Sequence, residues 1–223
     1  MSQQEDIKKQ QHQHAYQHKK SPNQAISGAQ SESVKEIGPI PNTPQVPSAE
    51  DAYVADGDIF TQLTDNHSTI QFDPVIKKGI AIFEILVLKS VDSVGIADES
   101  ERYNPGDYPH ERDDGKNMVE YGWEGDTGRI FNWGDENEGF KVDDRVTLEL
   151  NMDSNPRTLT FFKNDVEQPT FVTNIPAAVR FWVCIAFKDD SFKVLKFESI
   201  SAPVAKHGAD SIAWDFKSEK QDE

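Results

Sequence analysis

From about residue 53 onward, short hydrophobic runs alternate with polar positions and are separated by turn-forming residues. Successive side chains of a strand point to opposite faces, so a period of about two is typical of β-structure. The runs that fit are DIFTQL, TIQF, GIAIFEILVLK, SVGIAD, NMVEYGW, GRIFNW, RVTLELNM, TLTFFK, VRFWVCIAF and FKVLKFE. No helical period separates them. The pattern therefore predicts an all-β fold, an antiparallel two-sheet sandwich.

The run TLTFFK stops at Lys163 and is followed by Asn164 and Asp165. Both side chains can bond to nearby backbone and tolerate left-handed dihedrals, so we expect a turn that sends the chain back toward VRFWVCIAF. Large aromatic residues inside such runs are usually buried. The aromatic residues that we expect in the core are Phe83, Tyr121, Trp123, Phe161 and Trp182.

The N-terminal part of the chain differs from the middle in composition and in its lack of an apolar period. Residues 1–48 hold a Gln/His/Lys tract and then the Pro-punctuated run IGPIPNTPQVPS, with no sustained apolar period. Ordering such a segment costs backbone entropy with little apolar burial to offset it. The sequence predicts a disordered N-terminal tail over 1–48 that is dispensable for folding, a sandwich over 49–200 and a C-terminal extension over 201–223.

Charge narrows the classes of partner. Residues 1–48 carry five lysines against four acids, a net charge of +1. Because the whole chain carries −16, residues 49–223 carry −17. An acidic domain repels phosphates, which argues against nucleic acid. The longest apolar run, IAIFEILVL, is too short to span a bilayer. These features predict a neutral or basic partner and no membrane association.

Cys184 is the single cysteine and lies in the apolar run FWVCIAF. It can form no intramolecular disulfide, and its surroundings predict a buried thiol rather than a nucleophile. The first residues are polar and hold no apolar stretch of the signal-peptide type. We expect a cytoplasmic protein, with the nucleus as the alternative.

No set of catalytic or metal-binding residues is complete. His12, His14 and His18 lie close together, but no cysteine or carboxylate completes a site. Glu124 and Asp126 begin a glycosidase-like Glu-x-Asp-x-x-Glu pattern, but Arg129 takes the third place. A Gly-x-Ser-x-Gly turn and the EF-hand ligand order are also missing. We assign no catalytic residue, metal or cofactor, and keep a carbohydrate-binding or glycan-hydrolysing sandwich as the alternative.

Five motifs occur in order over roughly residues 55–198: GIAIFEILV, SVGIAD, YGWEGDTGRIFNWG, FKVDDRVTLELNMDSNPRTLTFFKND and the aromatic run VRFWVCIAF. As an ordered set, they resemble the SPRY domain family. Asp143-Asp144 stands where Gly-Asp is usual in that family, and Asn164-Asp165 stands where Asn-Gly is usual. Both substitutes tolerate turns, so we expect altered turn detail within the same fold.

The resemblance implies a bent, concanavalin-like two-sheet sandwich that is not an enzyme and binds a peptide or protein surface through loops at one end. The segment DESERYNPGDYPHERDDGKN, residues 98–117, is long for a loop in a compact domain, and such loops are usually functional or disordered. Tyr, Trp and Arg are frequent interface anchors. The partner-binding residues predicted in or beside polar loops are Tyr103, Tyr108, Arg112, Asn132 and Trp133, with local packing of the long loop as the alternative role.

Overall fold

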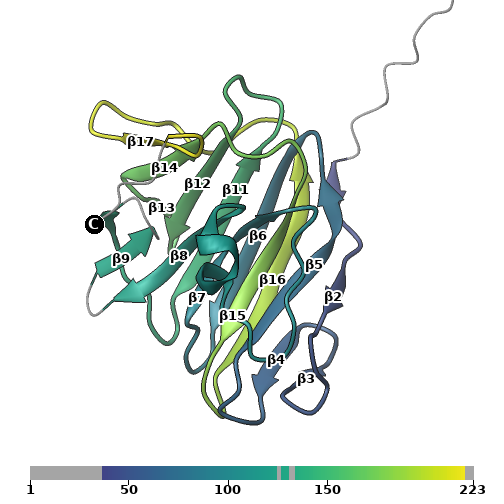
Figure 1. Cartoon of the computed structure of the whole chain (residues 1–223). Helices are drawn as coiled ribbons and strands as arrows, with labels where there is room; N and C mark the ends of the chain where they lie inside the picture. Colours follow the sequence, from purple (N-terminus) through teal and green to yellow (C-terminus); the bar gives the residue numbers. More distant parts are fainter. Residues whose placement is uncertain (1–36, 125–126, 131–133, 219–223) are drawn as a thin grey trace, which may run out of the picture. The chain divides into compact units, whose positions relative to one another are not determined.

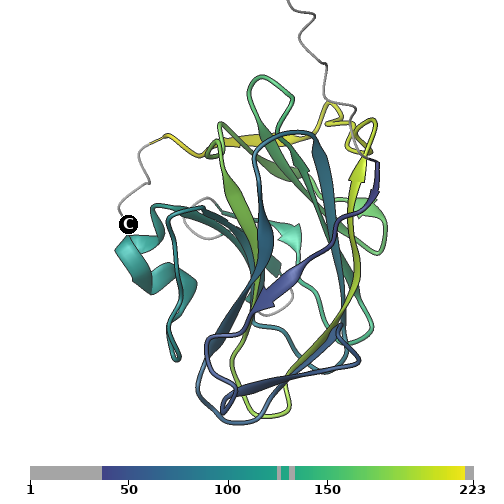
Figure 2. The ribbon, with the colours of Figure 1, turned by 90° about the vertical axis from the view of Figure 1, so that its right-hand side faces the viewer.

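The computed structural model describes residues 37–124, 127–130 and 134–218, which form two β-sheets lying face to face (Figures 1 and 2). The larger sheet has ten strands within the described residues. Eight of them lie side by side in the order β17 (Ile212–Asp215), β14 (Thr170–Thr173), β12 (Thr158–Lys163), β11 (Arg145–Asn151), β6 (Ile80–Val87), β16 (Ser191–Ile200), β4 (Ile59–Gln62) and β3 (Ala52–Ala55). In addition, β1 (Gly38–Pro39) pairs with β16, and β13 (Val166–Glu167) pairs with β12.

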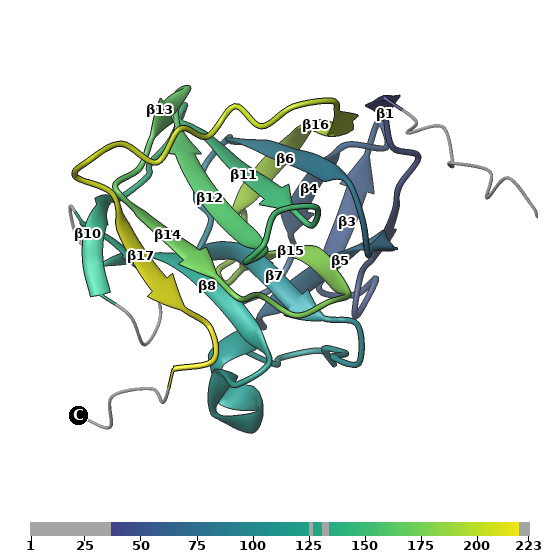
Figure 3. The same ribbon diagram turned by 90° about the horizontal axis from the view of Figure 1, so that it is seen from above.

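The smaller sheet has seven strands in the part of the chain that is described. Their order is β10 (Gly134–Glu138), β9 (Thr127–Ile130), β8 (Met118–Glu124), β7 (Ser93–Asp98), β15 (Val179–Ile185), β5 (Ser68–Ile76) and β2 (Thr43–Gln45). The view from above shows the two layers (Figure 3). The predicted all-β sandwich is thus confirmed, and each predicted run contains a strand.

The core lies between the sheets and combines many aliphatic side chains with a set of contacting aromatic rings. Phe83 on β6 stacks on Phe181 of β15 with ring centroids 5.1 Å apart, which joins the two layers. Phe60 stacks on Phe192 at 4.8 Å. The predicted burial of Phe83, Tyr121, Phe161 and Trp182 is confirmed. The side chain of Trp123 lies outside the described residues.

The two departures from the usual SPRY motifs, at Asp143-Asp144 and Asn164-Asp165, lie in turns whose backbone conformation these residues can adopt. Asn164 and Asp165 have φ of 50° and 67° and form the two-residue loop between β12 and β13. Positive φ at both positions is what the favoured hairpin turn requires, and Asn and Asp tolerate it better than most residues. Asp143 takes a φ of 70° where glycine is usual.

The ordered fold begins before residue 49. Strand β2 pairs with β5, β1 pairs with β16, and the side chains of Ile40 and Val46 pack against the core. The expected tail over 1–48 therefore needs correction over residues 38–46, which belong to the sandwich. The histidines at positions 12, 14 and 18 lie outside the described residues.

Part of the predicted C-terminal extension is also paired. The backbone amides of residues 204–207 donate to the carboxylates of Glu149 and Glu167 at 2.6–3.3 Å. Strand β17 then pairs in parallel with β14, and Trp214 packs against the core. No helix within the described ranges combines the length and apolarity that a membrane span requires.

Candidate functional site

The long loop, residues 98–117, joins β7 to β8 and contains the 3₁₀ helix η1 (Pro109–Gly115). Figure 2 shows it on the outer side of the smaller sheet, away from the larger one. Under it lies a second set of buried apolar side chains, which we call the outer cluster: Ala97, Tyr103, Met118, Trp182 and Cys184. The loop therefore covers a sheet face that would otherwise expose apolar surface.

The outer cluster accounts for the composition of VRFWVCIAF. Phe181 and Val183 of β15 belong to the core between the sheets, whereas Trp182 and Cys184 belong to the outer cluster. A strand covered on both faces reads as a continuous apolar run. The predicted burial of the Cys184 thiol is confirmed, and burial raises its pKa, so the thiol stays protonated.

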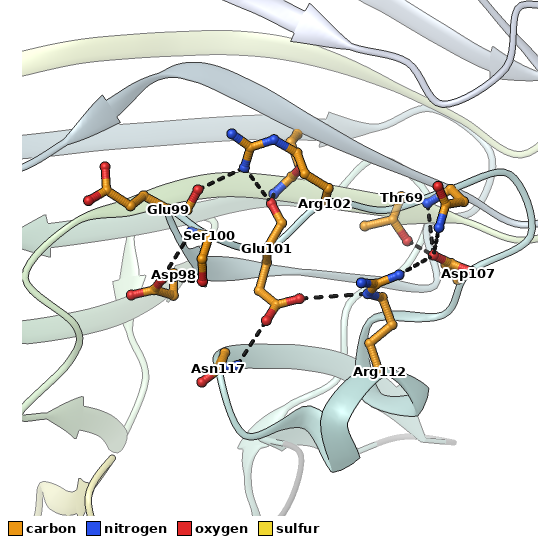
Figure 4. Close-up of polar contacts among 11 residues, drawn as sticks. Thr69, Asp98, Glu99, Ser100, Glu101, Arg102, Asp107, Arg112 and Asn117 are labelled. Carbon is orange, nitrogen blue, oxygen red and sulfur yellow. Dashed lines mark hydrogen bonds and ion pairs between the residues drawn. The ribbon is translucent and has the colours of Figure 1, made fainter.

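A polar network holds the loop in one shape (Figure 4). The Arg112 guanidinium lies between two carboxylates, with Nη1 2.9 Å from Asp107 Oδ2 and Nε 3.6 Å from Glu101 Oε2. The Asn117 side-chain amide donates to Glu101 Oε1 at 2.9 Å. Desolvation alone would raise the pKa of Asp107, but hydrogen bonds from Asn104 and Arg112, together with the Arg112 charge, lower it below its ordinary value. Arg112 thus connects both halves of the loop.

Further hydrogen bonds attach the loop to the sheet below it. Thr69 and Gln71 of β5 donate from their side chains to the carbonyls of Asp107 and Glu101, at 3.0 and 3.2 Å. Arg180 of β15 donates through Nη1 to the carbonyl of Glu99 at 2.8 Å. These bonds satisfy buried backbone acceptors, and they fix the loop on strands of a rigid sheet.

Tyr108 comes directly before η1, and His110 lies in its first turn. The Tyr108 ring lies 3.7 Å from the ring of His67 and 5.2 Å from that of His110, centroid to centroid. His110 Nδ1 lies 3.1 Å from Glu120 Oε2 on β8. This contact raises the pKa of His110, with smaller contributions from Asp92 and Glu111, and desolvation opposes it.

The His110–Glu120 contact predicts a pH-dependent attachment of η1. Because the folded-state pKa is raised, its stabilisation is complete below the ordinary histidine pKa of about 6.5 and is lost as pH rises through the raised value. Hydrogen exchange of amides 109–115, corrected for intrinsic rates, should be faster at about pH 8 than at about pH 6. His110→Gln should remove the difference. Equal protection at both pH values in the unmodified chain would contradict this prediction.

Beside the loop lies a depression of about 350 Å³. It is lined by Gln45, Val46, Pro47, Gln71, Asp73, Arg102, Tyr103 and Arg180. Three segments meet there: the end of β2, the outer face of β5 and β15, and the first part of the long loop. The depression thus lies between a sheet edge and an ordered loop, as ligand sites in sandwiches often do.

Two arginines dominate the polar lining. Arg180 Nε lies 2.6 Å from Asp73 Oδ1, and Asp73 Oδ2 accepts from the Gln45 side chain at 3.1 Å. Arg102 donates through Nη1 to the carbonyls of Glu99 and Glu101 at 2.7 and 2.6 Å (Figure 4). The Glu99 carbonyl therefore accepts from both arginines and holds them in the same region of the lining.

The structure brings together three of the five predicted partner-binding residues. Tyr103 is 9% exposed, and its ring packs in the outer cluster, which fits the alternative role of packing the loop. The residue also lines the depression. Tyr108 and Arg112 are partly exposed. Asn132 and Trp133 lie outside the described residues. As partner-binding residues, all five remain predictions.

Sequence reasoning missed most of the depression's lining. Gln45, Val46 and Pro47 fall in the segment assigned to a tail, and Arg102 lies in the long loop but is not among the predicted partner-binding residues. One signal was present: Arg180 is the single charged residue in VRFWVCIAF, and a charge in a buried strand needs a partner. Of the glycosidase-like positions, Asp126 and the side chain of Glu124 lie outside the described residues.

No family model matches the chain, and no curated protein matches it. Among solved structures, the chain is similar to the SPRY domain of human HERC1, with 17% identity, coverage of 69% of this chain and 94% of that one, and a TM-score of 0.51. It is similar to the TRIM65 PSpry domain, with 12% identity, 69% and 88% coverage and a TM-score of 0.53. A carbohydrate binding module, CBM66 from Bacillus subtilis, matches at 9% identity, 70% and 95% coverage and a TM-score of 0.44, too low to bear on function. The chain has the SPRY-domain fold.

Proposed function

We propose that this chain is a non-enzymatic protein-interaction module that binds a peptide or protein surface at the long loop and the adjoining depression. The observation that carries the proposal is the ordered loop itself. Arg112, Glu101 and Asp107 fix its shape, and Thr69, Gln71 and Arg180 attach it to the sheet. A pre-organised surface of this kind loses little entropy on binding a partner.

The similarity of the fold to solved SPRY domains also supports an interaction role. Two solved SPRY domains share the sandwich, and interaction modules with such folds recognise partners by loop side chains carried on a rigid scaffold. The face contains partly exposed Tyr108 and Arg112 and the exposed Arg102, which are side-chain types enriched at interfaces.

Three parallel assays test this function. The full chain is immobilised and offered a displayed library of random peptides, a glycan array, and chromogenic glycosides for turnover. We expect saturable binding of peptides, competed by the free peptide. Glycan binding or glycoside turnover in place of peptide binding would instead support the carbohydrate alternative and contradict the proposal.

The acidic field predicts salt-dependent association with a basic partner. Residues 49–223 carry −17, so a binding peptide extended by lysines should associate faster than its unextended form at low salt. The advantage should shrink as the Debye length falls toward about 8–10 Å, while dissociation changes little. Surface plasmon resonance at low and high salt measures both rates. An association rate that does not vary with salt would exclude steering.

A further inference from the structure

The positive charge of Arg102 is not neutralised within the described residues. Its Nη1 donates to two backbone carbonyls, which carry no net charge, and neither Nε nor Nη2 bonds to any residue that the structure describes. The side chain is exposed at the rim of the depression. The two carbonyl bonds hold the guanidinium in place and leave its remaining donors available.

The acids nearest the depression already have cationic partners. Asp73 is paired with Arg180 and also accepts from Gln45. The Glu99 carboxylate lies 2.7 Å from Lys77 Nζ. Glu101 is buried, accepts a hydrogen bond from the Asn117 side chain and forms an ion pair with Arg112. Each of these acids is therefore paired with a cation, whereas the Arg102 guanidinium has no acidic partner among the described residues. The depression thus has an unpaired positive charge, although the domain as a whole is acidic.

Tyr103 supplies a second donor. Its ring is packed under the loop, 6.4 Å from the Trp182 ring, and the residue also lines the depression. The hydroxyl makes no hydrogen bond to any described residue, and it is not among the fully buried polar atoms that lack a partner, so part of its surface is exposed. Burial, and then the charge of Glu101, raise the pKa of Tyr103, so the phenol stays protonated and can donate.

We propose that the depression binds a carboxylate of an extended peptide, through the free donors of Arg102 and the hydroxyl of Tyr103. Arginine is suited to this role because its planar fork matches a carboxylate and accepts it in a two-point contact. The inference rests on the proposed peptide-binding function and specifies its ligand.

The surroundings define the rest of the ligand. Val46 and Pro47 are apolar residues of the lining, so an apolar residue should neighbour the acidic one. Strand β2 is the last strand of the smaller sheet among the described residues, and an extended peptide can lie along such an edge. Because residues 49–223 carry −17, the remaining positions should be neutral or basic. The expected ligand has one carboxylate within an otherwise uncharged or basic segment.

The test uses peptides selected from a random display library on the full chain. Each is synthesised in its selected form and with every carboxylate in turn replaced by the amide, Asp→Asn, Glu→Gln or the C-terminal acid by its amide. Affinities are measured by fluorescence anisotropy. On the unmodified chain, one replacement should weaken binding about tenfold or more, the loss expected for one charge-assisted hydrogen-bonded contact.

Variants of the chain at Arg102 and Tyr103 test whether the lost affinity comes from contacts in the depression. With Arg102→Gln, the acid and amide forms should bind equally, and with Arg102→Lys the preference should be only partly kept. Tyr103→Phe keeps the packed ring and should weaken the acid form by a few-fold with an unchanged melting temperature. Lys193→Gln removes a cation that pairs with Asp58 on the other sheet, and it should leave the preference intact.

The outcomes separate the inference from the proposed function. Peptides that bind without any essential carboxylate, or an acid preference that Arg102→Gln leaves unchanged, would overturn the carboxylate site and leave the interaction module standing. A requirement for a phosphorylated peptide would also overturn it. A library that yields no binding peptide would contradict the proposed function and the site together.

Discussion

Trp182→Ala is expected to lower the free energy of unfolding by about 3–5 kcal/mol, the cost of truncating a large aromatic residue in a packed interior. The Trp182 side chain is fully buried in the outer cluster, between β15 and the long loop. Its indole lies so close to Gly95 that a Cβ added there would be 2.6 Å from an indole carbon. The denaturation midpoint in urea, followed by circular dichroism, measures the loss.

Phe187→Ala is the matched control. Phe187 is an aromatic residue five positions along the same run, but it is 62% exposed. Its truncation should change the free energy of unfolding by no more than about 0.5 kcal/mol. If both variants unfold at similar urea concentrations, the loop does not bury Trp182 as described. Trp182→Ala should also increase hydrogen exchange in residues 98–117, because the loop loses the surface that it packs on.

Removing residues 37–48 is expected to lower the melting temperature by about 5–10 °C. The segment carries β1 and β2, and the side chains of Ile40 and Val46 pack against the core. Losing two partly buried aliphatic side chains costs about 2–3 kcal/mol, and each kcal/mol corresponds to about 2–4 °C in a domain of this size. Thermal melts of chains that begin at Ile37 and at Ala49 provide the comparison. Coincident melts would support the dispensable tail predicted from the sequence alone.

The central strands were predictable because their signals are local. Runs such as RVTLELNM and TLTFFK alternate along their length, and Asn164-Asp165 provides turn chemistry between β12 and β13. Strands β1 and β2 carry no such signal. They contain two and three residues and each includes a proline, so their pairing depends on the edges of sheets that the rest of the chain has formed.

The pairing of β17 with β14 could not be predicted, because it depends on contacts between residues that are far apart in the sequence. Strand β17 lies parallel to β14, with Ile212 opposite Thr170, and local alternation cannot specify a parallel partner so far away. The preceding amides are held by the carboxylates of Glu149 and Glu167. Desolvation raises the pKa of Glu149, which marks how far this carboxylate is removed from water.

The long loop was predictable from the sequence, but its conformation was not. The length and composition of residues 98–117 indicated a functional or disordered loop, and the structure shows an ordered one that covers Trp182 and Cys184. The continuous apolar run FWVCIAF was the signal that the outer face of its strand is covered. The depression combines β2 with Arg102 and Arg180, which only the folded sheet brings together.

Hydrogen exchange of the full chain, with and without a peptide selected for binding, shows where on the sandwich the peptide binds. If the long loop and the adjoining depression form the binding face, the peptide should slow exchange in residues 98–117 and 43–47. Exchange in residues 204–216, on the other sheet, should not change. Slowing confined to residues 204–216 and β14, with the long loop unaffected, would contradict the claim and place binding elsewhere on the sandwich.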